Sequence, residues 1–163
     1  MIKNWTYNKK EINSISDMQA FIPKVWGFVY HLTLINKKTK KVEYFYIGKK
    51  NVYSIISKTA TKKEFESNPK SYFQRKKMKN GTWKYYNTVI KESNWKEYTS
   101  SNNFIKDHKN DYDIVREIVC FCSSDSELTY LEAKEIICND ALENQSYLNY
   151  GVSLRKFIKP KNI

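Results

Sequence analysis

Two segments rich in β-branched and aromatic residues lie close together in the first third of the chain. Residues 25–35 read Val-Trp-Gly-Phe-Val-Tyr-His-Leu-Thr-Leu-Ile, and residues 42–48 read Val-Glu-Tyr-Phe-Tyr-Ile-Gly. This composition is typical of β-strands. The lysine-rich residues 36–41 between them predict a turn. We therefore expect a hairpin of two strands, which we take to be antiparallel.

A third strand and a long helix are predicted in the last third of the chain. Residues 112–122 are rich in isoleucine, valine and aromatic side chains and predict a strand. The sequence Ser124-Asp125-Ser126-Glu127 has the pattern of a capping box. It predicts a helix that continues to about Asn139.

Two shorter helices and an arm complete the predicted elements. Residues 1–15 are polar without a clear period and predict an extended or loosely docked arm. A short helix is expected over residues 16–21. Another is expected to run to about Lys109, with Ser100 or Ser101 as its cap.

These elements predict an α/β (α+β) fold, in which a small mixed, mainly antiparallel three-stranded sheet is flanked by helices. The chain of 163 residues has room for one ordinary core. We divide it into an N-terminal arm with a short helix, a central domain with a basic insertion, and a basic tail. Their respective ranges are 1–24, 25–150 with the insertion at 49–98, and 151–163.

The net charge of +12 is concentrated in one part of the chain. Residues 37–98 hold 17 basic and 5 acidic residues, so they account for the whole excess. A localised basic block indicates a polyanionic partner. Nucleic acid is the first candidate, and an anionic membrane surface is the second.

Other classes of protein are disfavoured. No apolar run approaches the length of a membrane span, and the first five residues lack the apolar core of a signal peptide. The three cysteines fit a reducing compartment, so we expect a cytoplasmic protein without a membrane partner. Cys120, Cys122 and Cys138 have the spacing of no common zinc finger and are expected to be buried thiols.

Three residues could carry chemistry. Glu132 lies in the middle of the long helix, with Leu128 and Ile136 one turn away on either side. It is either an ordinary surface carboxylate or a ligand for a hard divalent cation such as Mg²⁺. Tyr30 and Tyr46 lie on the two hairpin strands, where they either pack in the core or bring two phenols together.

These residues belong to a set of motifs that resembles the GIY-YIG nuclease superfamily. Phe28-Val29-Tyr30 and Tyr46-Ile47-Gly48 resemble its paired motifs. Trp95-x-x-Tyr98-x-Ser100-Ser101 resembles a stretch of its phage and mobile-element members, which are homing-endonuclease-like. Tyr130-Leu131-Glu132-Ala133-Lys134 resembles its glutamate-bearing helix, and Tyr147-Leu148-Asn149 matches its closing asparagine.

The resemblance implies a DNA endonuclease that hydrolyses phosphodiester bonds with Mg²⁺ or Mn²⁺. It makes Glu132 the metal ligand. Tyr30 would deprotonate or orient the attacking water, and Tyr46 would bind the phosphate or that water. Asn149 would hold the loop of the active site.

The family's phosphate-binding arginine has two candidate equivalents. Relatives place this arginine on a helix soon after the second motif, where this chain has Lys58. Arg75 fits relatives with longer insertions, and we favour it over Lys58.

The basic insertion is expected to bind DNA, in the first place duplex DNA. The residues expected to contact it are Lys49, Lys50, Lys76, Lys77, Lys79, Lys84 and Trp95. Trp83, Tyr85, Tyr86 and Trp95 either stack on bases or pack the insertion against the domain. Specificity would come from residues 49–98, the terminal arms or a homodimer on DNA.

Several biological roles fit this expectation. The enzyme would be of freestanding homing type or a phage DNA-processing enzyme, acting in the host-cell cytoplasm if phage-encoded. One alternative is a catalytically degenerate nucleic-acid-binding module. Another, supported by charge alone, is an RNA-binding or membrane-surface protein.

Overall fold

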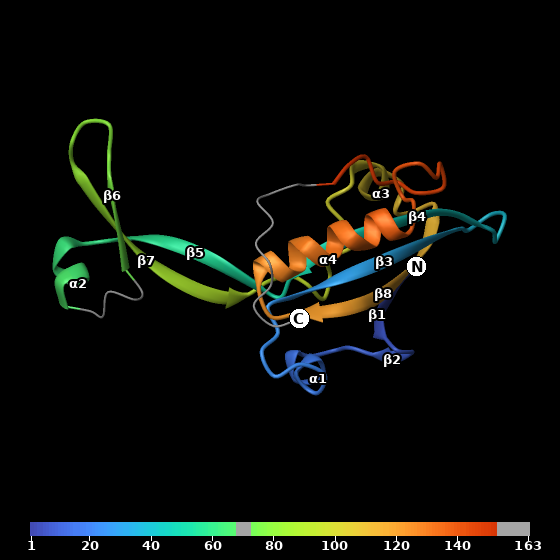
Figure 1. The fold of residues 1–163 in the computed structure, drawn as a ribbon, viewed down its shortest axis with the longest axis horizontal. Coiled ribbons are helices and arrows are strands. Elements are labelled where there is room, and N and C mark those ends of the chain that lie inside the picture. The colour runs from blue at the N-terminus through green and yellow to red at the C-terminus, as the bar shows by residue number, and fades with distance from the viewer. Residues whose placement is uncertain (68–72, 153–163) are drawn as a thin grey trace. The chain divides into compact units, whose positions relative to one another are not determined.

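The structure, a computed structural model, describes residues 1–67 and 73–152 (Figure 1). It divides the chain into two units. The first unit joins Met1–Val52 to Asn94–Ile163, and the second unit is Tyr53–Ser93. Most of the predicted basic tail lies outside the described residues.

The first unit contains a five-stranded sheet in the order β2-β1-β8-β3-β4. Its strands are β1 (Ile2–Tyr7), β2 (Lys10–Glu11), β3 (Gly27–Asn36), β4 (Val42–Asn51) and β8 (Tyr112–Cys122). The predicted hairpin is confirmed, because β3 and β4 pair antiparallel with Tyr30 opposite Gly48. β8 pairs antiparallel with the other side of β3, as a mainly antiparallel sheet requires.

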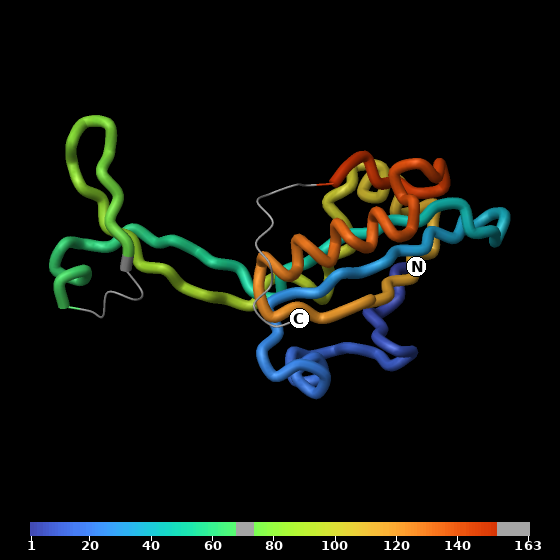
Figure 2. The backbone as a smooth tube through the Cα atoms, in the orientation of Figure 1, coloured from blue at the N-terminus to red at the C-terminus, as the bar shows by residue number. Residues whose placement is uncertain are grey.

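The prediction of a three-stranded sheet is wrong, because the N-terminal arm joins the sheet. β1 pairs in parallel with β8 and antiparallel with β2, which makes the sheet mixed (Figure 2). The indole of Trp5 is buried, and its Nε1 donates to the Trp95 carbonyl at 2.8 Å. A single large apolar side chain therefore docks an otherwise polar arm.

Helix α4 (Asp125–Cys138) packs against β3 and β4, as Figure 1 shows. The core beneath it consists of Val29, Ile47, Cys122, Leu128, Ile136 and Ala141. Gly27 permits this packing, since a Cβ there would come within 2.6 Å of Leu128 Cδ2. Ser124 caps the helix as predicted, whereas the Glu127 carboxylate accepts from Ser123 instead of completing the capping box with Ser124.

The shorter helices differ slightly from their predicted starts. α1 (Ile15–Gln19) is capped by Ser14, whose side chain forms a capping box with Asp17. α3 (Asn103–His108) is capped by Asn102, not by either of the serines before it. Among the described residues, no helix has both the length and the apolarity needed to cross a membrane.

The second unit is a separate antiparallel sheet in the order β5-β7-β6. Its strands are β5 (Tyr53–Ala60), β6 (Phe73–Lys77) and β7 (Trp83–Glu92). Helix α2 (Lys62–Ser67) packs on one face of this sheet, where the Phe65 ring lies 4.9 Å from the Tyr85 ring. The predicted insertion, residues 49–98, also includes the end of β4 and the segment that follows β7.

Candidate functional site

The Tyr30 phenol is the centre of an aromatic cluster in the first unit. Tyr30 is only 1% exposed, and its ring centroid lies 6.3 Å from those of both Tyr46 and Tyr98. Burial raises the pKa of Tyr30 well above its ordinary value, and the hydrogen bond with Tyr98 raises it further, against an opposing hydrogen bond with Ser100. The structure therefore favours a neutral phenol at this position.

Tyr46 shares these neighbours but is partly accessible. Burial raises its pKa, hydrogen bonds with Ser100 and Ser101 oppose that shift, and the charge of Glu132 adds to it. The hairpin thus brings the two predicted phenols together. Both hydroxyls share Ser100, which belongs to the segment between β7 and α3.

Glu132 is not an ordinary surface carboxylate. Its side chain is 17% exposed, and Lys49 Nζ lies 3.0 Å from its Oε2. The same ammonium donates to Thr129 Oγ1 at 2.9 Å, so it joins β4 to α4. Leu128 and Ile136, the helical neighbours named above, are both buried. A largely buried carboxylate that is paired with an ammonium favours a positive charge beside it, so a cation could also bind there.

The residues around Glu132 fit Mg²⁺ bound mainly by water and substrate. The described residues contain no group of three or more histidine, cysteine or acidic side chains that could enclose a metal ion. Mg²⁺ usually keeps several waters and binds through one or two carboxylates together with substrate phosphates. One carboxylate whose charge acts on the Tyr46 phenol suits that mode, with Lys49 as the competitor for the carboxylate.

Asn149 fixes the C-terminal segment to the second tyrosine strand. Its Oδ1 accepts from Ile47 N at 3.0 Å, and its Nδ2 donates to Ile47 O at 2.8 Å. β4 is an edge strand, so among the described residues no further strand pairs with Ile47 on its outer side. The side-chain amide of Asn149 makes the two backbone hydrogen bonds that such a strand would make. Asn102 adds a second tie by donating to Leu148 O at 2.9 Å. The amide thus braces the backbone between Tyr46 and Gly48.

Gly48 lets the two phenols approach each other. A Cβ at this position would lie 2.5 Å from the Tyr30 hydroxyl and 2.8 Å from Tyr46 Cε1. Since both atoms belong to ring side chains wedged in a packed cluster, the rings would have to move.

Gly48→Ala is therefore expected to destabilise the fold by about 1–3 kcal/mol. We also expect it to lower cleavage at least tenfold, because it displaces both phenols. Urea unfolding and a plasmid cleavage assay measure the two effects. Gly151→Ala is the matched control, since nothing lies within 4 Å of a Cβ there. Equal behaviour of the two variants would contradict the assignment of Gly48.

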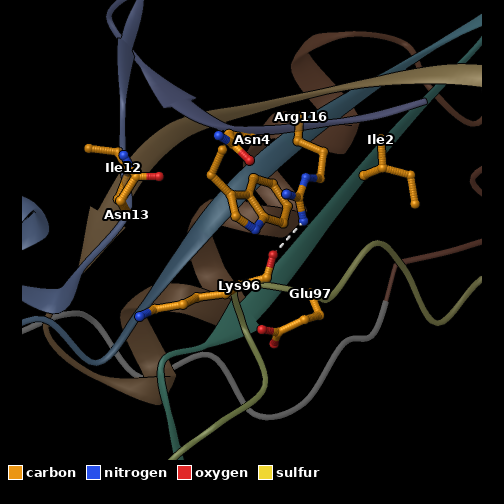
Figure 3. A pocket seen from close by; sticks show the side chains of 8 residues that line it. Ile2, Asn4, Ile12, Asn13, Lys96, Glu97 and Arg116 are labelled. Carbon is orange, nitrogen blue, oxygen red and sulfur yellow. Dashed lines mark hydrogen bonds between the residues drawn. The ribbon is translucent and has the colours of Figure 1, made fainter.

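Arg116 holds the segment that carries Tyr98 and Ser100, and the sequence reasoning missed this role. This buried guanidinium donates from Nη1 to the carbonyls of Lys96 (2.7 Å) and Tyr98 (2.9 Å), and from Nε to Lys3 O at 2.6 Å. Figure 3 shows the hydrogen bond from Arg116 to the Lys96 carbonyl. The guanidinium also lies 4.6 Å from the centroid of the Trp5 ring. Burial lowers its pKa to about 10. The only available signal was the scarcity of arginine, with three in a chain rich in lysine.

Arg116→Lys is expected to destabilise the protein by about 2–4 kcal/mol, because one ammonium cannot replace a planar group that reaches three carbonyls. Chemical denaturation measures this effect. Lys96→Ala is the control, since Lys96 accepts from Arg116 with its main-chain carbonyl only and its side chain is exposed. A stability loss in the control as large as in Arg116→Lys would contradict this account.

Two other residues that were predicted to contact DNA, Lys50 and Trp95, pack around the aromatic cluster of this site. Lys50 Nζ donates to Asn94 Oδ1 at 2.8 Å and lies 4.1 Å from the Tyr98 ring centroid, and burial lowers its pKa. Trp95 is 0% exposed and packs edge-on against Phe28. The prediction that Trp95 contacts DNA is wrong, because a fully buried indole cannot stack on a base.

The remaining predicted residues belong to the second unit. Lys58 is exposed on β5, and the exposed Arg75 lies on β6 with its guanidinium 4.8 Å from the Trp83 ring. The turn between β6 and β7 gathers the other predicted lysines around a hollow of about 500 Å³. Its basic lining residues are Lys76, Lys77, Lys79 and Lys84.

A mixed sheet with α4 on one face and paired tyrosines on neighbouring strands is the arrangement of a GIY-YIG nuclease domain. The chain belongs to the family described as "Putative endonuclease segE, GIY-YIG domain", which it matches over residues 5–152. The family supports nuclease activity, with DNA as the substrate. The comparisons with curated proteins and with solved structures found no match.

Proposed function

We propose that this protein is a divalent-metal-dependent endonuclease that hydrolyses phosphodiester bonds in duplex DNA. The observation that carries the proposal is the largely buried Glu132 carboxylate, whose charge acts on the Tyr46 phenol of the paired-tyrosine cluster. Glu132 would hold Mg²⁺ or Mn²⁺. When bound, such an ion supplies positive charge that stabilises the phosphate and the leaving oxygen.

Tyr30 would orient the attacking water instead of deprotonating it. Its pKa is raised by burial, so the phenol stays neutral and acts through hydrogen bonds. Tyr46, which is more accessible, would donate to a phosphate oxygen. Ser100 forms hydrogen bonds with both hydroxyls, and Asn149 fixes the backbone of Ile47, next to Tyr46 on β4.

Cations near the phenols would bind the scissile phosphate. Lys49 and Lys50 lie at the end of β4, one paired with Glu132 and the other above Tyr98. With Glu132 holding a divalent cation, Lys49, which also donates to Thr129, would be available to contact a DNA phosphate. Arg75, with Lys58 as the alternative, would supply the further cation that the family provides as arginine.

The biological role we propose is that of a freestanding homing-type or phage DNA-processing enzyme. The Trp-x-x-Tyr-x-Ser-Ser stretch supports this role, because it resembles a stretch of the phage and mobile-element members of the superfamily. A homodimer on DNA is one way for such a small chain to cut both strands.

One observation favours a second candidate, a catalytically inactive DNA-binding module. Lys49 already neutralises Glu132 at 3.0 Å, so the carboxylate has a partner without any metal. A crystal of the full chain with duplex DNA and Mn²⁺ separates the two candidates. An anomalous peak beside the Glu132 carboxylate and one phosphate supports the nuclease. DNA bound with the Lys49–Glu132 pair intact and no such peak supports the module.

A further inference from the structure

A hollow in the first unit lies where the N-terminal arm meets the segment between β7 and α3 (Figure 3). Its volume of about 440 Å³ is within the range of small-molecule sites. Three parts of the chain form its walls, and they include Ile2, Trp5 and Ile12 of the arm, Lys96 and Glu97 of the segment, and Arg116 of β8. We call this hollow the arm pocket.

The buried guanidinium of Arg116 can donate a further hydrogen bond in the arm pocket. Arg116 is 5% exposed, and its Nε and Nη1 donate to three main-chain carbonyls. Within the part of the chain that the structure describes, its Nη2 has no hydrogen-bond partner. A buried donor without an acceptor costs free energy. An acceptor on a ligand in the arm pocket would remove that cost.

Glu97 adds a carboxylate to the same pocket without pairing with the guanidinium. Its charge raises the pKa of Arg116, against the effect of burial. Among the described residues, however, Glu97 has neither a hydrogen bond nor an ion pair. Figure 3 shows the side chains of Arg116 and Glu97 on different sides of the pocket. Since a guanidinium only donates and a carboxylate only accepts, one ligand must offer an acceptor to the first and donors to the second.

The edge of a nucleobase has this pattern. A base is a flat, largely apolar ring whose edge carries donors and acceptors side by side. In guanine the O6 acceptor lies next to two N–H groups that one carboxylate can accept together, whereas the other bases offer such a carboxylate fewer adjacent donors. The apolar side chains of Ile2, Trp5 and Ile12 suit the ring, and the exposed Lys96 ammonium suits a phosphate.

We propose that the arm pocket binds a guanine nucleotide. Arg116 donates to O6 of the base, Glu97 accepts from its N–H groups, and Lys96 pairs with the phosphate. The nucleotide is either free or the terminal nucleotide of a single strand. This inference goes beyond the proposed endonuclease function and does not depend on it.

The arm pocket adjoins the groups that support the phenols. The ring centroid of Trp5 lies 5.1 Å from that of Tyr30. Arg116 holds the carbonyl of Tyr98, whose side chain is hydrogen-bonded to Tyr30. A nucleotide in the pocket would therefore contact two residues that pack against or hold the aromatic cluster.

Isothermal titration calorimetry of guanosine monophosphate into the full-length protein tests the proposal, with EDTA present so that no metal occupies Glu132. We expect saturable binding of one nucleotide with a Kd below about 1 mM. Glu97→Gln should weaken binding about tenfold or more, because it removes a charge-assisted acceptor. Glu143→Gln, at an exposed glutamate that follows α4, is the matched control and should change the Kd by less than about twofold.

The phosphate contact has its own measurement. Lys96→Gln should weaken binding of guanosine monophosphate about fivefold and leave the binding of guanosine unchanged, since the nucleoside carries no charge for Lys96. Lys106→Gln, at an exposed lysine of α3, is the matched control and should leave both affinities unchanged.

A single-stranded oligonucleotide with a terminal guanosine phosphate distinguishes the two sources of the nucleotide. If it binds more tightly than guanosine monophosphate and is equally sensitive to Glu97→Gln, the occupant is the end of a strand. If it binds more weakly, the occupant is the free nucleotide.

Four results would overturn the proposal. Neither probe might bind, or inorganic phosphate might bind as tightly as the nucleotide, which would leave a simple anion site. Equal losses in Glu97→Gln and Glu143→Gln would place the ligand elsewhere. Adenosine, cytidine or thymidine monophosphate bound as tightly as the guanine nucleotide would make the base wrong. None of these measurements requires cleavage, so the failure of this inference is distinguishable from the failure of the proposed function.

Discussion

Glu132→Gln is expected to reduce DNA cleavage by about a thousandfold or more while leaving duplex binding intact. The amide keeps the shape of the side chain but removes the charge that would hold a divalent cation, whose electrostatic stabilisation is worth several kcal/mol. Lys49 keeps its hydrogen bond to Thr129, so α4 stays joined to β4. Plasmid cleavage and electrophoretic mobility shifts measure the two properties.

Glu135→Gln is the matched control for that variant. Glu135 lies one turn further along the same helix and pairs with His31 Nε2 at 3.2 Å, away from the phenols. Its loss removes the same charge and should leave cleavage within about twofold of the original protein. Cleavage retained by Glu132→Gln, or lost equally in both variants, would contradict the metal-ligand assignment.

Tyr30→Phe is expected to lower cleavage by about a hundredfold to a thousandfold, because it removes one preorganised hydrogen-bonding hydroxyl. The ring keeps its packing, so the folded structure should persist at neutral pH. Tyr112→Phe is the control, since it removes a buried phenol that donates to Glu43 at 2.8 Å on another part of the sheet. A Tyr30→Phe protein that cleaves as fast as this control would exclude Tyr30 from the reaction.

The same variant has a second readout at alkaline pH. Burial raises the pKa of Tyr30 above its ordinary value of 10.0, so the folded state favours the neutral phenol. This contribution to stability is fully present below about pH 10 and is lost as the pH rises further. Tyr30→Phe removes the titrating group and should therefore resist alkaline unfolding better, as measured by circular dichroism.

The sequence was most informative where apolar patterns are dense. The hairpin, strand β8 and helix α4 lie close to their predicted positions because strongly apolar segments and a capping serine define them. The N-terminal strand was missed because one buried residue, Trp5, docks a polar segment. The β5-β7-β6 sheet was missed because both of its faces are partly exposed, which leaves no hydrophobic period to detect.

Only those residues of the candidate site that belong to recognisable sequence motifs could be predicted. The sequence indicated Tyr30, Tyr46 and Glu132; in the structure the two tyrosine rings are neighbours, and the charge of Glu132 acts on Tyr46. Trp95 was placed on DNA because it follows a basic segment, but the segment returns to the core through Trp5. The role of Arg116 depends on carbonyls distant in sequence, so no local pattern could show it.

The most direct test is a plasmid nicking assay at low salt. The unmodified protein is assayed with Mg²⁺, then with EDTA, and then after Mg²⁺ is restored in excess. The Glu132→Gln variant is assayed under the same three conditions. The account predicts nicking with Mg²⁺, none in EDTA, recovery on restoration, and none by the variant under any condition. Nicking that persists in EDTA or in Glu132→Gln would contradict a metal centre at Glu132. Duplex binding without nicking in every sample would contradict the nuclease and leave the DNA-binding module.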